Sequence, residues 1–276
     1  MEKANKKAAH GSGGENTVSL LALERISKRF GGLLAVDRVS FAVEEGRVVG
    51  LIGPNGAGKT TVFNLITGNL RPDAGTVFFR GQNLHGQAPH RIVALGIART
   101  FQSIRLFQGM TVLENVLAGC HCRMQAGLFS SLFHTPGQRR EERAALAEAQ
   151  RVLAFVGLLA AANQVAGNLS YGKQRLLEIA RALATRPSLL ILDEPAGGMN
   201  EQETAELASL IARLRVQGLS ILLIEHDMRL VMRSCDHLVV LEYGRKIAEG
   251  TPAEIRSNPK VIEAYLGADT DDDDAA

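Results

Sequence analysis

The sequence predicts an α/β fold in which a helical subdomain interrupts a parallel-sheet core. Continuous apolar segments at residues 189–192, 220–224 and 237–242 alternate with helical patterns. This alternation indicates parallel strands that helices cover on both faces. From residue 110 to residue 183 the helical pattern dominates instead. A glycine-rich turn at residues 53–60 joins an apolar strand to a helical segment, which is the third observation behind the prediction.

The first part of the chain reads as a β-rich edge that leads into the core. Residues 34–43 alternate apolar and polar side chains and end at the turn Glu44-Glu45-Gly46, which is typical of a strand with one buried face. Residues 47–52 are mostly apolar and predict a buried strand. The expected strands of this part are residues 18–24, 34–43, 47–52 and 75–80.

Helices are expected to dominate the middle of the chain and then to alternate with strands. Residues 171–184 place Leu176, Ile179 and Leu183 on one side, which is the spacing of an amphipathic helix. The other expected helices are residues 111–117, 138–156, 202–217 and 228–234.

We expect one domain at residues 17–267, with the helical subdomain inserted at roughly residues 103–184. Residues 1–16 are polar and basic and lack the apolar segment of a secretory signal. Residues 268–276 carry a run of aspartates, and like charges in sequence disfavour a folded segment. Both end segments are therefore expected to be flexible tails.

Charge and composition exclude several classes of protein. The formal net charge of +2 is too small to favour nucleic acid as a partner. No stretch approaches the roughly 18 consecutive apolar residues that a membrane-spanning helix needs. Cys120, His121 and Cys122 are adjacent, whereas zinc ligands are spaced so that they converge on one ion. We therefore expect a reduced, intracellular protein without structural zinc.

Residues 53–60 match the pattern G-x-x-x-x-G-K-[ST] directly after the apolar strand. Glycines let the backbone wrap a triphosphate tail and point its N–H groups inward, and the following helix adds partial positive charge. Lys59 is expected to reach the β- and γ-phosphates, and the Thr60 hydroxyl to ligate Mg²⁺. The alternative, a turn without a ligand, is disfavoured because strand, loop and both side chains are in register. The candidate nucleotide-binding residues here are Gly53, Asn55, Gly56, Gly58, Lys59, Thr60 and Thr61.

Asp193 and Glu194 follow the apolar strand at residues 188–192, which is a Walker B pattern. We expect Asp193 to help hold Mg²⁺ beside Thr60, mostly through water, because Mg²⁺ loses its hydration shell reluctantly. Glu194 is placed to orient or deprotonate the attacking water. Strand-end acids are often only solvated, but the preceding phosphate-binding pattern favours the functional interpretation.

Ser170 precedes a long helix, and Gly172 stands in its first turn. Serine is a favoured N-cap residue, so a capped helix without a ligand is one interpretation. A helix start of this kind is also an anion site. Two phosphate-binding helix starts for one triphosphate make sense if the second serves the nucleotide of another subunit.

Together these motifs resemble the ATPase subunits of ATP-binding cassette (ABC) transporters over residues 17–267, and they stand in that family's order. The resemblance implies the ABC ATPase fold, which is a P-loop NTPase (RecA-like) parallel-sheet core with an antiparallel β subdomain and an inserted α-helical subdomain. The matching motifs are the Walker A loop at residues 53–61, a glutamine loop at Thr100-Phe101-Gln102, the signature at residues 169–174, Walker B at residues 189–194 and a switch histidine in residues 224–227.

The resemblance implies roles for three further residues. Phe30 matches the aromatic side chain that stacks on adenine, although by itself it reads as a core residue. Gln102 would touch Mg²⁺ or the attacking water and would respond to the membrane subunit. His226 would contact the γ-phosphate and orient Glu194 and the water. The implied catalytic set is Glu194, His226 and Gln102, and the implied Mg²⁺ set is Thr60, Gln102 and Asp193.

At the signature, Ser170 and Gly172 would hold the γ-phosphate that is bound to the loop of a second ATPase subunit. The commonest signature is Leu-Ser-Gly-Gly-Gln, and this chain departs from it at Tyr171 and Lys173. The two residues that would face phosphate are kept. After Walker B many members end in Leu-Asp, whereas this chain has Asn200, which can hydrogen-bond across a dimer interface but carries no charge.

Several segments are similar to one group within the family, the first of the two ATPase subunits of bacterial high-affinity branched-chain amino acid importers. This resemblance implies a head-to-tail dimer with a second ATPase subunit, which is a paralogue or a second copy. Two transmembrane permeases would bind it at the cytoplasmic face of the inner membrane, and a periplasmic or surface binding protein would deliver leucine, isoleucine or valine. The segments are residues 30–36, 99–107, 127–136, 176–181, 223–228 and 264–267.

Residues around the glutamine loop are unusually apolar for a loop, and two explanations are open. The apolar residues are Ile104, Leu106, Phe107 and Met110. Contact with a permease would explain them, and so would burial under the helical subdomain.

Other functions share parts of the pattern. Very similar ATPases serve importers of short amides or urea, and lipopolysaccharide-export ATPases share a similar ending but are not expected to carry the insert at residues 127–137. A soluble ABC ATPase of translation or DNA repair usually has two cassettes or a long coiled coil, and this chain has no sustained heptads. A non-enzymatic scaffold would not need Glu194 and His226.

Overall fold

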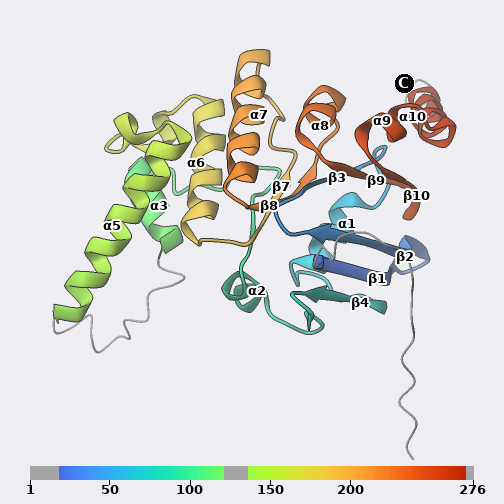
Figure 1. The fold of residues 1–276 in the computed structure, drawn as a ribbon, viewed down its shortest axis with the longest axis horizontal. Coiled ribbons are helices and arrows are strands. Elements are labelled where there is room, and N and C mark those ends of the chain that lie inside the picture. The colour runs from blue at the N-terminus through green and yellow to red at the C-terminus, as the bar shows by residue number, and fades with distance from the viewer. Residues whose placement is uncertain (1–18, 121–135, 272–276) are drawn as a thin grey trace, which may run out of the picture.

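The sheet at the centre of the fold is parallel except at one edge (Figure 1). Its strands are β3 (Val48–Ile52), β6 (Ile97–Arg99), β7 (Leu189–Asp193), β8 (Ser220–Ile224), β9 (His237–Glu242) and β10 (Arg245–Gly250). The computed structural model describes residues 19–120 and 136–271, and within them the strand order is β10-β9-β3-β8-β7-β6. All neighbouring pairs are parallel except β9 with β10.

A second, antiparallel sheet lies on one side of this core. It consists of β1 (Ser19–Phe30), β2 (Leu33–Glu44), β4 (Ala74–Phe79) and β5 (Gln82–Asn83), in the order β2-β1-β4-β5. The first strand runs six residues past its predicted end at residue 24, because β1 stays paired with β2 as far as Phe30. Figure 1 shows α1 (Lys59–Ile66) on the same side of the core as this sheet.

Helices α7 (Glu201–Val216) and α8 (Met228–Ser234) cover the other face of the central sheet. Alternate residues of β8 show the two-sided burial, since Ile221 and Leu223 pack in the core on the α7 side. Leu222 and Ile224 pack in a second core, with α1 and the antiparallel sheet. The prediction of a parallel sheet covered on both faces is thus confirmed, and it explains why these strands are apolar without alternation.

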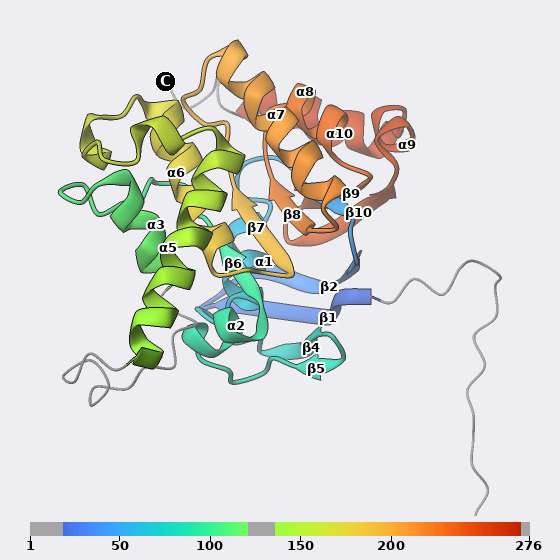
Figure 2. The ribbon, with the colours of Figure 1, turned by 60° about the vertical axis from the view of Figure 1, so that its left-hand side comes forward.

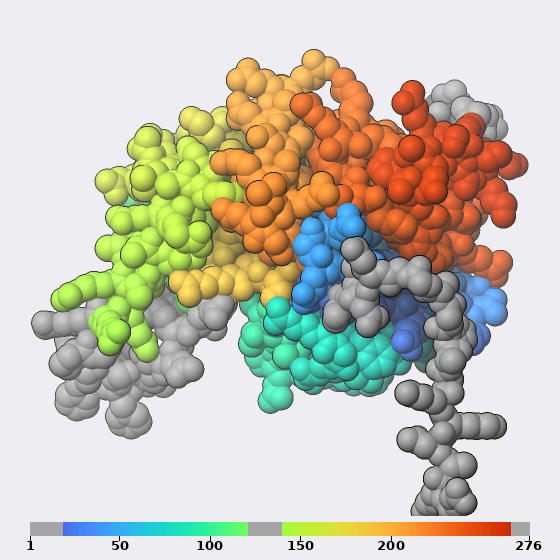
Figure 3. Space-filling view, in the orientation of Figure 1, coloured from blue at the N-terminus to red at the C-terminus, as the bar shows by residue number. Residues whose placement is uncertain are grey.

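The helical region, which we define as α3 (Val112–Cys120), α5 (Pro136–Val156) and α6 (Tyr171–Ala184), stands beside the core. Figures 2 and 3 show it as a lobe next to α7. Gly119 lets α3 approach α6 closely, because a Cβ atom there would lie 2.3 Å from the carbonyl oxygen of Arg181. Helix α5 begins at Pro136, two residues before its predicted start, and proline is favoured at the first helical position.

Several elements were not predicted. They are β5, β6, β10, α2 (Pro89–Leu95), α9 (Pro252–Arg256) and α10 (Pro259–Asp271), with the short 3-10 turns Leu159–Ala161 and Ala166–Asn168. Strand β6 has three residues, too few for a pattern, and β10 is a largely polar edge strand. Helix α10 continues to Asp271, four residues past residue 267, where the sequence predicted the domain to end and the acidic tail of residues 268–276 to follow. The predicted tail at residues 1–16 and most of the insert at residues 127–136 lie outside the described residues.

Candidate nucleotide-binding site

The glycine-rich loop joins β3 to α1 and adopts conformations that need glycine. Gly53 and Gly58 have φ angles of +150° and +96°, which residues with a side chain rarely adopt. A Cβ atom on Gly53 would lie 2.1 Å from the carbonyl oxygen of Leu241, and one on Gly58 would lie 2.5 Å from a backbone oxygen of β2. Gly58 is also the N-cap of α1 and provides no side-chain cap, so the first N–H groups of the helix are available to an anion.

The Lys59 side chain folds back over this loop. Its Nζ atom donates hydrogen bonds to the carbonyl oxygens of Gly53 and Pro54, at 2.6 Å and 2.8 Å. The residue is only 8% exposed. Burial lowers the pKa of Lys59, and the carboxylates of Glu194 and Asp193 oppose that effect. The ammonium group therefore lies within electrostatic reach of both acids that the sequence predicted for the site.

A cavity of about 500 Å³ lies against the loop, and this volume is in the usual range for small-molecule sites. Tyr243 also lines it, from the turn between β9 and β10, and sequence reasoning missed this residue. Its 80% exposed side chain had no motif to mark it. The predicted site residues that line the cavity are Phe30, Asn55, Gly56, Gly58, Lys59, Thr60, Thr61, Gln102 and Glu194.

Three predicted catalytic side chains meet at one carboxylate oxygen. Nε2 of Gln102 donates a hydrogen bond to Oε2 of Glu194 at 2.9 Å. Nδ1 of His226 lies 4.0 Å from the same oxygen. Glu194 stands just beyond β7 with a φ angle of +46°, and its N–H donates to the carbonyl oxygen of Ile224 at 3.0 Å. The glutamine loop, the end of β7 and the end of β8 thus converge here.

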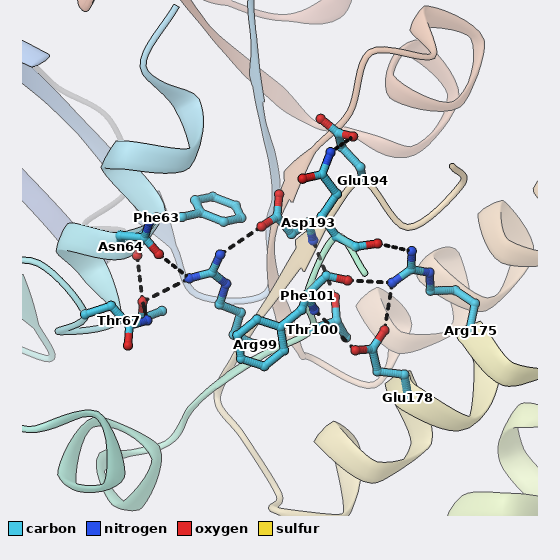
Figure 4. Close-up of polar contacts among 12 residues, drawn as sticks. Phe63, Asn64, Thr67, Arg99, Thr100, Phe101, Arg175, Glu178, Asp193 and Glu194 are labelled. Carbon is cyan, nitrogen blue, oxygen red and sulfur yellow. Dashed lines mark hydrogen bonds and ion pairs between the residues drawn. The ribbon is translucent and has the colours of Figure 1, made fainter. Parts of the chain in front are cut away.

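Asp193 has a partner that the sequence did not indicate (Figure 4). Nη2 of Arg99 lies 2.9 Å from Oδ2 of Asp193, and both side chains are almost fully buried. Burial raises the pKa of Asp193, and Arg99 acts in the opposite direction. Arg99 also donates to the side-chain oxygen of Asn64 on α1 at 2.7 Å, and its guanidinium packs on the ring of Phe101. The only available signal was its position three residues before Gln102.

Glu225 is a third residue whose contribution to the site the sequence did not predict. It is fully buried and accepts hydrogen bonds from the N–H groups of Ala196 and His226, at 2.7 Å and 3.1 Å. Burial raises the pKa of Glu225, and these backbone donors oppose that effect. The side chain ties the turn after Glu194 to the segment that carries His226.

Ser170 and Gly172 stand at the start of α6, and neither lines the cavity at the loop. Ser170 occupies the predicted N-cap position of α6, and its side chain makes no capping hydrogen bond. Its exposed hydroxyl remains available to a ligand. Gly172 is buried, and a Cβ atom there would lie 2.3 Å from Oε1 of Glu203. Close packing against α7 is therefore a structural reason for a glycine at this position, in addition to the predicted contact with phosphate.

Two further expectations can be set against the structure. The Asn200 side chain caps α7, where it accepts a hydrogen bond from the N–H of Glu203 at 2.9 Å.

The apolar residues near the glutamine loop divide between the two explanations, burial in the fold and contact with a permease. Leu106 packs against the core, whereas Phe107 and Met110 are 49% and 43% exposed.

A comparison with family models decides the family of this fold and site. Residues 36–197 match the model described as "ABC transporter". This chain belongs to the ABC transporter family. Residues 245–271 also match the model described as "Branched-chain amino acid ATP-binding cassette transporter", and this stretch of the ABC protein includes β10, α9 and α10.

Relatives of this ABC protein include high-affinity branched-chain amino acid transport ATP-binding proteins. LivG of Salmonella typhimurium is 53% identical over 90% of this chain and 98% of its own length. BraF of Pseudomonas aeruginosa is 50% identical with the same coverage of both chains.

A solved structure confirms the predicted ABC ATPase fold. The crystal structure of an ATP-binding cassette of an ABC transporter in its ADP conformation is 38% identical to this chain. It covers 91% of this chain and 100% of the solved one, with a TM-score of 0.80. In the part of this ABC protein that the structure describes, no helix is long and apolar enough to cross a membrane.

Proposed function

We propose that this chain is the ATP-binding and ATP-hydrolysing subunit of an ABC importer for branched-chain amino acids. The observation that carries the ATPase proposal is the meeting of the glycine-rich loop, Gln102 and Glu194 at one cavity. The cargo is supported by the 53% identity to LivG across 98% of that protein and by the match at residues 245–271.

The loop would bind the triphosphate, and Phe30 would stack on the adenine. Backbone N–H groups of the loop and of the first turn of α1 suit phosphate oxygens. Lys59 would exchange its hydrogen bonds to loop carbonyls for bonds to the β- and γ-phosphates, since both are acceptors for the same ammonium group. The loop residues assigned to the phosphates are Gly53, Asn55, Gly56, Gly58, Lys59, Thr60 and Thr61.

Thr60, Gln102 and Asp193 would hold Mg²⁺. They offer a hydroxyl, an amide and a carboxylate oxygen, and such hard oxygen donors are what Mg²⁺ prefers. Bound there, Mg²⁺ would neutralise charge on the phosphates. Burial raises the pKa of Asp193, and the ion pair with Arg99 opposes that rise, so Arg99 favours the charged carboxylate that a cation needs.

Glu194 would orient the attacking water or take its proton. The Gln102 amide donates to one of its oxygens, which fixes the direction of the carboxylate and leaves its other oxygen for water. Nδ1 of His226 lies 4.0 Å from an oxygen of the same carboxylate, and this side chain would orient Glu194 and contact the γ-phosphate. A general base must lie within hydrogen-bond reach of the proton that it abstracts, and Glu194 lines the cavity where the water would stand.

Ser170 and Gly172 would act on the nucleotide of a second ATPase subunit. Both stand at the start of α6 and do not line the cavity at this chain's own loop. The exposed Ser170 hydroxyl and the first N–H groups of α6 would form an anion site that a head-to-tail dimer would bring to the other subunit's γ-phosphate. The second subunit is a paralogue or another copy of this chain.

The assembly would include two transmembrane permeases and, indirectly, a periplasmic or surface substrate-binding protein. Phe107 and Met110 are exposed close to the glutamine loop, and an apolar surface there suits contact with a permease. Such an assembly would hold this chain, as a peripheral subunit, at the cytoplasmic face of the bacterial inner membrane.

The ATPase proposal is tested with Glu194→Gln. This substitution keeps the shape of the side chain and removes the carboxylate, so ATP binding should persist while steady-state turnover is lost. Turnover and binding of a fluorescent ATP analogue are measured on the same preparations. Equal turnover in the variant and the wild type would refute the assignment of Glu194.

The cargo is tested by uptake of labelled leucine at low concentration in the source cell, with the native gene or with Lys59→Ala. Loss of high-affinity uptake at unchanged protein level supports both the ATPase role and the cargo. Unchanged uptake in a strain without a redundant transporter would remove leucine as the cargo, and short amides and urea would be measured next.

A further inference from the structure

Arg175 and Glu178 form a buried ion pair on one face of α6. Their side chains are 1% and 2% exposed, and Nη1 of Arg175 lies 2.7 Å from Oε2 of Glu178. Both groups lose much hydration free energy on burial, so a buried ion pair is weak evidence of a contribution to stability. The other contacts of these two side chains therefore indicate their role better than the ion pair itself does.

The pair holds the backbone of the glutamine loop on both sides of the Gln102 side chain (Figure 4). Nη1 of Arg175 donates to the carbonyl oxygen of Phe101 at 2.6 Å, and Nη2 donates to that of Gln102 at 2.7 Å. Oε1 of Glu178 accepts from the N–H groups of Phe101 and Arg105, at 3.3 Å and 3.4 Å. Two side chains of α6 thus restrain backbone groups of Phe101, Gln102 and Arg105.

The restrained residue is the one that reaches the catalytic carboxylate. The carbonyl group that Arg175 holds belongs to Gln102, whose side-chain amide donates to Glu194 at 2.9 Å. A planar guanidinium can serve two carbonyl groups and a carboxylate at once, because its donors form a rigid fork. The direction of the Gln102 side chain therefore depends on where α6 holds its backbone.

We propose that Arg175 and Glu178 are positioning residues for hydrolysis, which keep Gln102 directed at Glu194. The inference rests on the function proposed above for Gln102 and Glu194. It also joins two sites, because Ser170 and Arg175 stand on the same helix. A shift of α6 on contact of Ser170 with the second subunit's nucleotide would move the glutamine loop of this chain's own site, and rigid elements of this kind carry coupling between sites.

A pair that served only to stabilise the core would behave differently. Its removal would lower turnover only as far as it lowered the folded fraction. A positioning pair acts through Gln102, so its removal should lower the turnover rate while the protein stays folded. In a protein that already lacks the Gln102 side chain, its removal should lower the turnover rate no further.

The test variant is Arg175→Met with Glu178→Met. It removes both charges together, and replacement of a buried ion pair by apolar side chains of similar volume is often neutral or stabilising. The matched control is Arg151→Met, which removes one exposed guanidinium from its ion pair with Glu148 on α5. If the double variant fails to fold, Arg175→Lys replaces it, because lysine keeps the charge and loses the fork.

Amide hydrogen exchange of the full chain measures the restraint directly. We expect Phe101 and Arg105 to exchange roughly tenfold faster in the double variant, because each loses its hydrogen bond to Glu178. Arg151→Met should leave both rates unchanged. Unchanged exchange at Phe101 and Arg105 in the folded double variant would overturn the proposal.

ATP turnover of the full chain measures the consequence. We expect kcat of the double variant to fall on the order of tenfold to a hundredfold, with the KM for ATP within about twofold of the wild type, because a positioning defect acts on the chemical step. In a Gln102→Ala background the same double substitution should cause no further loss. A further fall in kcat when the double substitution is added to Gln102→Ala would overturn the proposal.

The two hypotheses fail in different ways. If the wild type and Glu194→Gln hydrolyse ATP equally, the proposed function fails, while the exchange rates still report whether the pair restrains the loop. If the wild type hydrolyses ATP and the folded double variant matches it, the positioning role fails and the proposed function stands.

Discussion

Arg99 and Asp193 join the edge strand β6 to its neighbour β7 through a buried ion pair with an N–O distance of 2.9 Å. The same guanidinium hydrogen-bonds Asn64 of α1 and packs on Phe101, next to Gln102. Three of the segments that build the candidate site, namely the helix after the glycine-rich loop, the glutamine loop and the end of β7, are thus connected by one side chain.

Loss of Arg99 should destabilise the fold. Arg99→Met leaves the Asp193 carboxylate buried without its cationic partner, and removal of one member of such a pair costs about 3 kcal/mol. Urea unfolding of the variant measures this loss. Arg245→Met is the control, because Arg245 is 67% exposed in its pair with Asp37 and should cost less than about 1 kcal/mol. Equal losses of unfolding free energy in the two variants would show that burial of the Arg99–Asp193 pair does not increase its contribution to stability.

The start of α6 should act on another subunit's nucleotide. Ser170→Arg places a long side chain at an exposed N-cap position that does not line this chain's own cavity. We expect unchanged binding of an ATP analogue by the isolated chain and loss of hydrolysis in the assembled complex. Equilibrium binding and turnover are measured separately for this purpose. A loss of binding in the isolated chain would mean that Ser170 serves its own site.

The close approach of α3 and α6 should make Gly119 intolerant of a side chain. A Cβ atom there would lie 2.3 Å from the carbonyl oxygen of Arg181 and 3.1 Å from Cβ of Ala184. Overpacking of this kind costs more than the helix propensity that alanine gains, so Gly119→Ala should lower the free energy of unfolding by about 1–2 kcal/mol. Gly109→Ala is the matched control, because no atom lies within 4 Å of its Cβ position.

Glu148 should give the stability a dependence on acid pH. Arg151 holds the pKa of Glu148 at about 2, against the opposing effect of burial and with a further contribution from Arg186, whereas the ordinary value is 4.5. A depressed pKa in the folded state means stabilisation that is present above the unfolded pKa and lost as the pH falls through the folded one. The difference between wild type and Glu148→Gln should be about 1 kcal/mol at pH 7, since both arginines are more than half exposed.

Unfolding free energies at several pH values check this prediction. The difference between the two proteins should shrink as the pH falls from about 4.5 to about 2, and it should also shrink in concentrated salt, which screens exposed charges. A difference that stays constant across this range would assign the effect to packing rather than to the ion pairs.

The motifs could be recognised from sequence because each one occupies neighbouring residues. The glycine-rich loop follows its strand directly, and Asp193 and Glu194 follow theirs. Strands β3, β7, β8 and β9 were predicted to within one residue, since burial on both faces makes them continuously apolar. Strands β6 and β10 escaped prediction, because three residues or a polar edge leave no periodic pattern.

By itself, the sequence determined the fold class, the order of the motifs and most of the residues around the cavity, because local periodicity and contiguous motifs carry that information. Only the tertiary structure decided which distant residues meet. Arg99 and Asp193 are 94 residues apart in the chain, and Arg175 lies 73 residues from Gln102. Contacts of this range depend on how strands pair and helices pack across the whole domain, and no local pattern in the chain records them.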